Sequence, residues 1–368
     1  MNNTIVIKLG SSTLTLGSKH LNKAHMLEVV RVIAKLKEQG YRVVLVSSGA
    51  MAAGRELLKD PDLAATLSSK QLLASVGQGK LIEVWESLFA IYSIHIGQIL
   101  LTGADLEDRE RFLNAHDTLI ALLDYGIVPI INENDAVCTE EIKVGDNDNL
   151  AAISGILVAA DSVILLTDQK GLYTADPRKN PDAKLISQIY EIDESIYKLA
   201  GGAGTSLGTG GMQTKIQAAD IATKAGIELV IASGNNPELI LDLVKGKGEA
   251  TFFKPSKSPL LAKKQWLSAA AKSSGQVIVD AGAAHAIKKQ GSSLLPSGIT
   301  KVSGSFLRGS VIDIVANDGS FIAKGITRYS SLEIEKIKGI KSQQIDTVLG
   351  FNHGSVVVHR DDLSLKGG

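Results

Sequence analysis

The stretch Glu133–Leu150 reads E-N-D-A-V-C-T-E-E-I-K-V-G-D-N-D-N-L and separates a strand-like segment from a helix-like one. Before it, the apolar run Ile127–Ile131 has the length and β-branched content of a buried strand. At its end, Leu150–Ala160 has the small apolar residues of a buried helix, with Asx residues at the helix N-terminus. A strand, a polar loop and a helix in this order predict a βα unit of an α/β domain.

This unit carries two clusters of carboxylates and amides, at Asn132–Asp135 and at Asp146–Asn149. Ligands of open α/β sheets bind beyond the carboxyl ends of the strands. A pair of Asx-rich turns is the alternative interpretation, and it would suffice for a single cluster. Because both clusters fall at the strand end and helix start of one unit, they favour a site for an amine, a carboxylate or a metal-nucleotide.

The composition sets bounds on the class of protein. A chain of 368 residues with 44% hydrophobic and 4% aromatic residues predicts two or three domains with mainly aliphatic cores. Lysine plus arginine and aspartate plus glutamate number 39 each, and the pI is near 7.1. A balanced chain has no overall field that would attract nucleic acid or anionic lipid, so a polyanionic partner would require a local patch.

Cysteine, histidine and hydropathy patterns indicate a cytoplasmic protein. Cys138 is the only cysteine, which excludes an intrachain disulfide and suits a reducing compartment. A lone buried thiol explains it more simply than a nucleophile does. The seven histidines are scattered and lack the close pairs of a zinc site. We expect no signal peptide and no membrane span, because no apolar run reaches roughly 18 residues.

Two strands near the N-terminus are each followed by small residues. Thr4–Leu9 runs into Gly10-Ser11-Ser12, and Tyr41–Val46 runs into Ser47-Ser48-Gly49-Ala50. Neighbouring parallel strands would bring these ends to one crevice. Neither segment contains the P-loop or the dinucleotide-binding glycine pattern. A nucleotide would therefore have to be bound by another device.

Lys8 lies within an apolar strand, where an ammonium group is costly to bury without an anion. It is a candidate ligand of a phosphate or carboxylate, and Gly10 would let backbone N–H groups approach the same anion. The alternative is that Lys8 points to solvent from an edge strand. The residues alone leave both interpretations open.

Strands and helices continue to alternate through about residue 250, which predicts a mostly parallel sheet. We expect helices at Asn22–Gln39, Ser69–Ala90, Asp105–Asp124 and Pro237–Lys245, and strands at Tyr92–Leu101, Ser162–Leu166 and Ile227–Ala232. The segment Thr167–Pro177 predicts a β-hairpin. Because it follows a strand end, it is a candidate for contacts to a base or ribose.

The segment Gly201–Lys215 is rich in glycine and precedes a predicted helix, Ile216–Gly226. A mobile linker is the alternative interpretation for its first part, Gly201–Gly208. In the second part, Thr209-Gly210-Gly211 would lie at the helix N-terminus, where free N–H groups and the helix dipole bind anions. Lys215 follows about one turn later, so we favour phosphate binding here.

The composition changes after residue 250, and we predict three regions: an α/β domain at 1–250, a linker at 251–274 and a small β-rich domain at 275–368. The strands expected in the last region are Gln276–Val279, Thr300–Phe306, Ser310–Ala316, Phe321–Tyr329 and Ser355–His359, with short helices at Ala283–Gln290 and Ser331–Lys336.

These motifs together resemble those of the glutamate 5-kinases, a family of the amino-acid kinase superfamily. The motifs are Ile7–Gly10 (I-K-L-G), Ser47–Ala50 (S-S-G-A), Ile131–Asp135 (I-N-E-N-D), Lys143–Leu150 (K-V-G-D-N-D-N-L), Leu166–Tyr173 (L-T-D-Q-K-G-L-Y) and Gly208–Lys215 (G-T-G-G-M-Q-T-K). The region after residue 275 resembles a PUA domain, including Gly291–Pro296. The resemblance covers nearly the whole chain. Ser11 departs from it, where threonine is expected, but keeps the hydroxyl group.

The resemblance implies an open, mostly parallel sheet with helices on both faces. The implied reaction is transfer of the γ-phosphoryl group of ATP to the side-chain carboxylate of L-glutamate, the first step of proline biosynthesis. Phosphoryl transfer requires positioning and positive charge rather than a covalent nucleophile. Lys8 and Lys215 are the expected catalytic cations, and Asp148 is expected to hold both. Gly10 and Gly49 would donate backbone N–H groups to the moving phosphoryl group.

The resemblance also implies two sets of binding residues. The glutamate-binding set is Ser48, Asn132, Asp135 and Asn147. Asp135 suits the α-ammonium group, and the amides and hydroxyl suit carboxylate oxygens. The nucleotide-binding set is Lys8, Thr167, Asp168, Thr209, Gly210, Gly211, Met212, Gln213, Thr214 and Lys215. Mg²⁺ would arrive with ATP, held mainly by phosphates and waters, with no metal site built from protein side chains.

Other interpretations remain. A related kinase could act on N-acetylglutamate or aspartate, although an acidic partner such as Asp135 favours a free amine. The PUA-like domain also suggests RNA binding, but its basic residues are partly offset by acids and no aromatic stacking platform is evident. We therefore expect a supporting or regulatory role for that domain. The resemblance further implies feedback inhibition by proline and a homo-oligomer, either a dimer or a tetramer.

Overall fold

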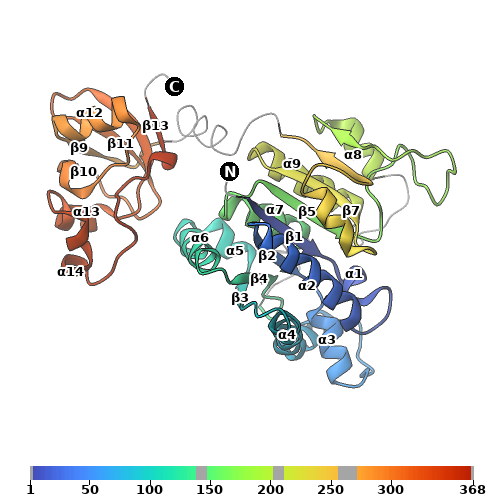
Figure 1. Ribbon diagram of the computed structural model, residues 1–368. Coiled ribbons are helices and arrows are strands. Elements are labelled where there is room, and N and C mark those ends of the chain that lie inside the picture. Colours follow the sequence, from blue (N-terminus) through green and yellow to red (C-terminus); the bar gives the residue numbers. More distant parts are fainter. Residues whose placement is uncertain (1–2, 138–146, 202–210, 256–271, 366–368) are drawn as a thin grey trace. The chain divides into compact units, whose positions relative to one another are not determined.

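The computed structural model describes residues 3–137, 147–201, 211–255 and 272–365. The chain divides into two compact units, one formed by residues 1–108 and 114–256 and the other by residues 109–113 and 257–368 (Figure 1). None of the helices in the described ranges has both the length and the apolar character needed to cross a bilayer.

The first unit is built on an eight-stranded sheet with the order β3-β4-β2-β1-β5-β7-β8-β6 in the described residues. Its strands are β1 Thr4–Leu9, β2 Arg42–Ser47, β3 Ile96–Leu101, β4 Val128–Glu133, β5 Ser162–Thr167, β6 Gln188–Ile189, β7 Glu228–Ser233 and β8 Ala250–Phe253. All neighbours are parallel except β7 and β8, which are antiparallel. The predicted mostly parallel sheet is confirmed.

Strand β1 lies in the middle of this sheet, hydrogen-bonded to β2 on one side and to β5 on the other. Ile7 is level with Leu45 of β2 and with Ile164 of β5, so the carboxyl ends of the three strands lie at the same edge. Strand β4 joins β2 on its far side. Four neighbouring parallel strands therefore end together, which is where ligands of such sheets bind.

The helices described in this unit are α1 Ser11–Thr15, α2 Lys23–Glu38, α3 Ala50–Leu57, α4 Leu67–Ala90, α5 Gly103–Glu107, α6 Arg109–Asp124 (of which residues 109–113 belong to the second unit), α7 Asn147–Leu157, α8 Glu194–Ala200, α9 Met212–Lys224 and α10 Ile240–Leu243, with a 3-10 turn at Pro237–Leu239. On β1, Ile5, Ile7 and Leu9 pack in one core cluster with residues of α2. Successive strand residues point to opposite faces, so Lys8 faces the side opposite α2.

Helices α3 and α4 cross with almost no space between their backbones. A Cβ atom placed on Gly54 of α3 would lie 2.0 Å from the carbonyl oxygen of Leu73, and one on Gly77 of α4 would lie 1.9 Å from that of Ala50. Only glycine permits this approach. The crossing fixes the N-terminal half of α4 next to α3, which begins directly after Gly49.

Several local predictions need correction. The helix expected at Asp105–Asp124 is two helices, because Asp108 adopts an extended conformation between α5 and α6. The expected β-hairpin at Thr167–Pro177 is reduced to one antiparallel bridge between Tyr173 and Leu185. Strand β8 pairs with β7 as far as Phe253, so the sheet extends into the range expected to be a linker.

The second unit is a five-stranded sheet with the order β10-β9-β11-β12-β13 in the described residues. Its elements are β9 Gly275–Val279, α12 Ala281–Gln290, β10 Ile299–Ser303, β11 Val311–Ala316, β12 Phe321–Ile326, α13 Ser331–Ile337, α14 Ile345–Leu349 and β13 Leu363–Leu365, with 3-10 turns at Pro296–Gly298, Ser342–Gln344 and Arg360–Asp362. It has its own core, in which Tyr329 is fully buried.

The prediction of a strand at Ser355–His359 is wrong. In that segment Val358 makes a single antiparallel bridge with Leu294, and the last strand of the sheet is Leu363–Leu365 instead. Val357 and Val358 are both fully buried, although a regular strand with one covered face would alternate. The apolar run therefore contributes to the core without joining the ladder.

Candidate active site

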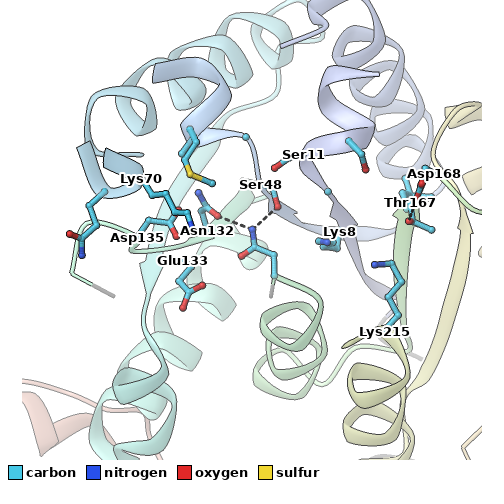
Figure 2. A pocket seen from close by; sticks show the side chains of 18 of the residues that line it. Lys8, Ser11, Ser48, Lys70, Asn132, Glu133, Asp135, Thr167, Asp168 and Lys215 are labelled. Carbon is cyan, nitrogen blue, oxygen red and sulfur yellow. Dashed lines mark hydrogen bonds between the residues drawn. The ribbon is translucent and has the colours of Figure 1, made fainter. Parts of the chain in front are cut away.

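A cavity of about 470 Å³ lies at the carboxyl ends of β1, β2, β4 and β5 (Figure 2). Most residues predicted to bind or act on a ligand line it. These are Lys8, Gly10, Ser48, Gly49, Asn132, Asp135, Asn147, Thr167, Asp168 and Lys215. Segments as distant in sequence as β1 and α9 therefore contribute to a common wall, because the parallel strands end at one edge of the sheet.

Asp148 connects two buried lysines. Its Oδ1 atom lies 2.7 Å from Nζ of Lys8, and its Oδ2 atom lies 3.0 Å from Nζ of Lys215. Lys8 is 4% exposed and Lys215 is 5% exposed. The alternative in which Lys8 points to solvent from an edge strand is excluded, because β1 is central and Lys8 is buried.

The pKa of Asp148 reflects two opposing effects. Burial raises it, but the ammonium groups of Lys8 and Lys215 outweigh burial and hold the pKa below the ordinary value of an aspartate. Asp148 also lies in the first turn of α7, where the helix dipole favours a negative charge. The carboxylate is therefore ionised, and these three side chains together carry one net positive charge facing the cavity.

A chain of hydrogen bonds joins three residues of the cavity lining, Ser48, Asn147 and Asn132, and continues to helix α4. Asn147 donates through Nδ2 to Oγ of Ser48 (2.7 Å) and to Oδ1 of Asn132 (3.1 Å), as the dashed lines in Figure 2 mark. Asn132 donates in turn through Nδ2 to Oε1 of Gln78 on α4 (2.8 Å). The chain fixes the orientation of both asparagine amides and of the Ser48 hydroxyl.

Hydrogen bonds from helix α4 stabilise the turn after β2. The indole of Trp85, fully buried on α4, donates to Oγ of Ser47 (2.9 Å), which donates to the carbonyl oxygen of Ser48 (2.9 Å). Gly49 follows with φ of 105°, a conformation that favours glycine. A Cβ atom there would also lie 3.1 Å from Cδ1 of Leu14. The backbone around Gly49 is thus closely defined.

Some of the predicted nucleotide-binding residues line the cavity and others do not. Thr167 and Asp168 line the cavity, and the threonine hydroxyl donates to Oδ1 of Asp168 (2.8 Å). Thr214 does not line it; its Oγ1 atom lies 3.2 Å from Oδ2 of Asp148 and 2.8 Å from the carbonyl oxygen of Gly211. Met212 and Gln213 belong to the first turn of α9 but do not line the cavity formed by the described residues.

Thr209 and Gly210 lie outside the described residues, as do Cys138 and Asp146. Gly211 is described and precedes α9 as its N-cap. Among the described residues, no group of three or more histidine, cysteine, aspartate or glutamate side chains is arranged to hold a metal ion.

Helix α4 brings residues to the site that the sequence did not single out. Lys70 and Gln71 line the cavity, and Gln78 supports it through Asn132. Lys70, Ala74 and Gln78 are spaced by four residues and so share one face of the helix. A lysine and a glutamine on a helix are ordinary surface residues, however. Only the packing of α4 against α3 shows that they belong to the site.

Comparison with known proteins agrees with this geometry. The amino acid kinase family model matches residues 3–233, and the PUA domain model matches residues 275–349. The chain is 57% identical over 360 residues to a glutamate 5-kinase of Photobacterium profundum, covering 98% of this chain and 95% of that protein. It is 57% identical over 362 residues to a glutamate 5-kinase of Aliivibrio salmonicida, covering 98% of each. A buried lysine–aspartate–lysine cluster in a kinase domain, followed by a PUA domain, thus agrees with these matches, and the chain belongs to the amino acid kinase family and, within it, to the glutamate 5-kinases.

Proposed function

We propose that this kinase transfers the γ-phosphoryl group of ATP to the side-chain carboxylate of L-glutamate, giving L-glutamyl 5-phosphate for proline biosynthesis. The observation that carries the proposal is the pair of buried ammonium groups, Lys8 and Lys215, held by Asp148 at the wall of the cavity. Two relatives that are each 57% identical to this chain are glutamate 5-kinases, which supports the choice of substrate.

The lysines supply positive charge where phosphoryl transfer develops negative charge. Two anionic reactants, a carboxylate and a triphosphate, must approach each other, and the cluster of Lys8, Asp148 and Lys215 offers them one net positive charge. Asp148 orients both ammonium groups before the substrates bind, so little reorganisation is needed during the reaction. Backbone N–H groups of Gly10 and Gly49 would contact the moving phosphoryl group.

The polar part of the cavity would bind the amino acid. Asp135 lies in the lining and would accept the α-ammonium group, and Ser48, Asn132 and Asn147 would offer a hydroxyl and amides to carboxylate oxygens. Since Asn147 already links Ser48 to Asn132, these groups are oriented in advance. Such preorganisation would hold the distal carboxylate in line with the phosphoryl group.

The nucleotide would bind at Thr167, Asp168 and Lys215, which line the cavity, and would extend to Gly211 at the N-terminus of α9. When bound, Mg²⁺ neutralises charge on the phosphate oxygens. It suits a site of this kind because Mg²⁺ keeps several waters and takes its remaining ligands from phosphates. Proline as an inhibitor, a homo-oligomer and a cytoplasmic location belong to the same proposal.

An ADP-release assay with a panel of free and N-acetylated acidic amino acids tests the proposal. We expect turnover with L-glutamate well above that with aspartate or N-acetylglutamate, and trapping with hydroxylamine should yield the hydroxamate of the side-chain carboxyl group. Turnover with N-acetylglutamate in preference to glutamate would overturn the substrate assignment. Absence of a trapped acyl phosphate would overturn the reaction.

A further inference from the structure

Lys70 is a cation of the cavity that the proposed mechanism leaves without a role. It lies near the N-terminus of α4, with an exposed side chain that lines the cavity. Figure 2 shows Lys70 and Asp135 at one end of the cavity, with Lys8 and Lys215 towards the other. Lys80, farther along the same helix, pairs instead with Glu83 at 2.8 Å and does not line the cavity.

The assignments made so far leave the α-carboxylate of glutamate without a positively charged partner in the cavity. Free glutamate carries a side-chain carboxylate, an α-ammonium group and an α-carboxylate. The first is assigned to the end near Lys8, and the second to Asp135. The α-carboxylate must then lie near Asp135 and Glu133, both acidic and both in the lining. Without a cation nearby, those acids would repel it.

Lys70 supplies that cation. Apart from Lys8 and Lys215, it is the one lysine or arginine among the described residues that line the cavity. Its place at the Asp135 end gives a positive and a negative group together, which is the complement of the zwitterionic head of an amino acid. The flexible side chain of a lysine can adjust to a ligand at modest cost.

We propose that Lys70 binds the α-carboxylate and makes the enzyme selective for substrates that carry both an α-ammonium and an α-carboxylate group. The inference rests on the proposed function and extends it to a residue of α4. The close packing of α4 against α3 at Gly54 and Gly77 holds the helix that carries Lys70 beside the cavity.

The test compares L-glutamate with its α-amide, which keeps the amine and the side-chain carboxylate but loses the negative charge of the α-carboxylate. Steady-state ADP release and competition assays give the KM or Ki of each compound for the wild type, Lys70→Gln, Lys70→Arg and the matched control Lys80→Gln. We expect Lys70→Gln to raise the KM for glutamate about tenfold, with kcat and the KM for ATP unchanged. The constant for the α-amide should stay the same, so the preference for glutamate over the amide should be lost.

The other variants and outcomes complete the test. Lys70→Arg should retain most of the preference, and Lys80→Gln should match the wild type. Equal weakening of both compounds by Lys70→Gln, or no change in either, would overturn the inference. A wild-type enzyme that releases no ADP with glutamate would instead overturn the proposed function, so the two failures are distinguishable.

Discussion

Asp148 is the counterion that Lys8 and Lys215 share in the proposed site. It is fully buried and contacts both Lys8 and Lys215, so its removal would leave two buried ammonium groups without this counterion. We expect Asp148→Asn to lower kcat on the order of a hundredfold and to reduce the free energy of unfolding by about 3 kcal/mol. Steady-state kinetics and urea unfolding at neutral pH measure the two effects.

The stability effect of Asp148→Asn should depend on pH. Because the folded-state pKa of Asp148 is lowered, its ion pairs stabilise the protein fully above the unfolded-state pKa of about 3.9. That stabilisation is lost as pH falls through the lower folded-state pKa. The difference between wild type and variant should therefore be constant near neutral pH and shrink below about pH 4. A difference that grew on acidification would contradict the assignment.

Gln78 illustrates a supporting residue outside the cavity lining. Its Oε1 atom accepts the hydrogen bond of Asn132, which orients that amide towards Asn147. We expect Gln78→Met to raise the KM for glutamate about tenfold with the KM for ATP unchanged, since the Asn132 amide loses its acceptor. Gln78→Glu keeps an acceptor and should have a smaller effect. An unchanged KM for glutamate in Gln78→Met would show that this hydrogen bond does not position Asn132.

Among the elements of the first unit, which we call the kinase unit, α3 and α4 cross with their backbones in close contact at Gly54 and Gly77. We expect Gly77→Ala to reduce the free energy of unfolding by about 1–3 kcal/mol, because the new methyl group would meet the backbone of α3. Gly79→Ala is the matched control on the same helix, where a Cβ atom meets nothing within 4 Å. It should be neutral or stabilise by up to about 1 kcal/mol. Equal effects of the two variants in urea unfolding would contradict the close crossing.

The sequence predicted regular elements well where local patterns are strong. Strand β1 matches its predicted range, Thr4–Leu9, because β-branched residues fill it and a glycine ends it. Helix α2 begins after Asn22, whose side chain caps it as expected of an Asx residue. Helix α8 was not predicted, because Glu194–Ala200 is short and has no buried side chain in the described structure. A helix with no buried face lacks the periodic apolar residues from which helices are predicted.

The candidate site was predictable in its residues more than in its arrangement. Lys8 stood out because an ammonium group in an apolar strand needs an anion, but strand order, which decides whether it lies at an edge or in the centre, is a tertiary property. Gln78 and Lys70 gave no signal at all. They are ordinary polar residues of a helix, and only the approach of α3 and α4 brings them to the cavity.

At the scale of the whole molecule, the kinase unit contains every residue that lines the described cavity. The second unit, which contains the PUA domain and which we call the PUA unit, has a separate core that includes Tyr329 and Ile314. We expect a chain ending at residue 256 to fold and to keep kcat within about threefold of the full chain, because domains with their own cores fold as units. Activity assays of the two chains check this. A large loss of kcat in a truncated chain that remains folded would show that the PUA unit contributes to catalysis.

We propose that Lys8 and Lys215, joined by Asp148, hold the transferring phosphoryl group between them. The most direct measurement is a crystal structure of the enzyme with glutamate, Mg²⁺ and a non-hydrolysable ATP analogue. We predict that Nζ of both lysines will lie within hydrogen-bonding distance, about 3 Å, of the γ-phosphate or of the bridging oxygen next to it. Ammonium groups turned away from the triphosphate in that complex would contradict this role of the two lysines.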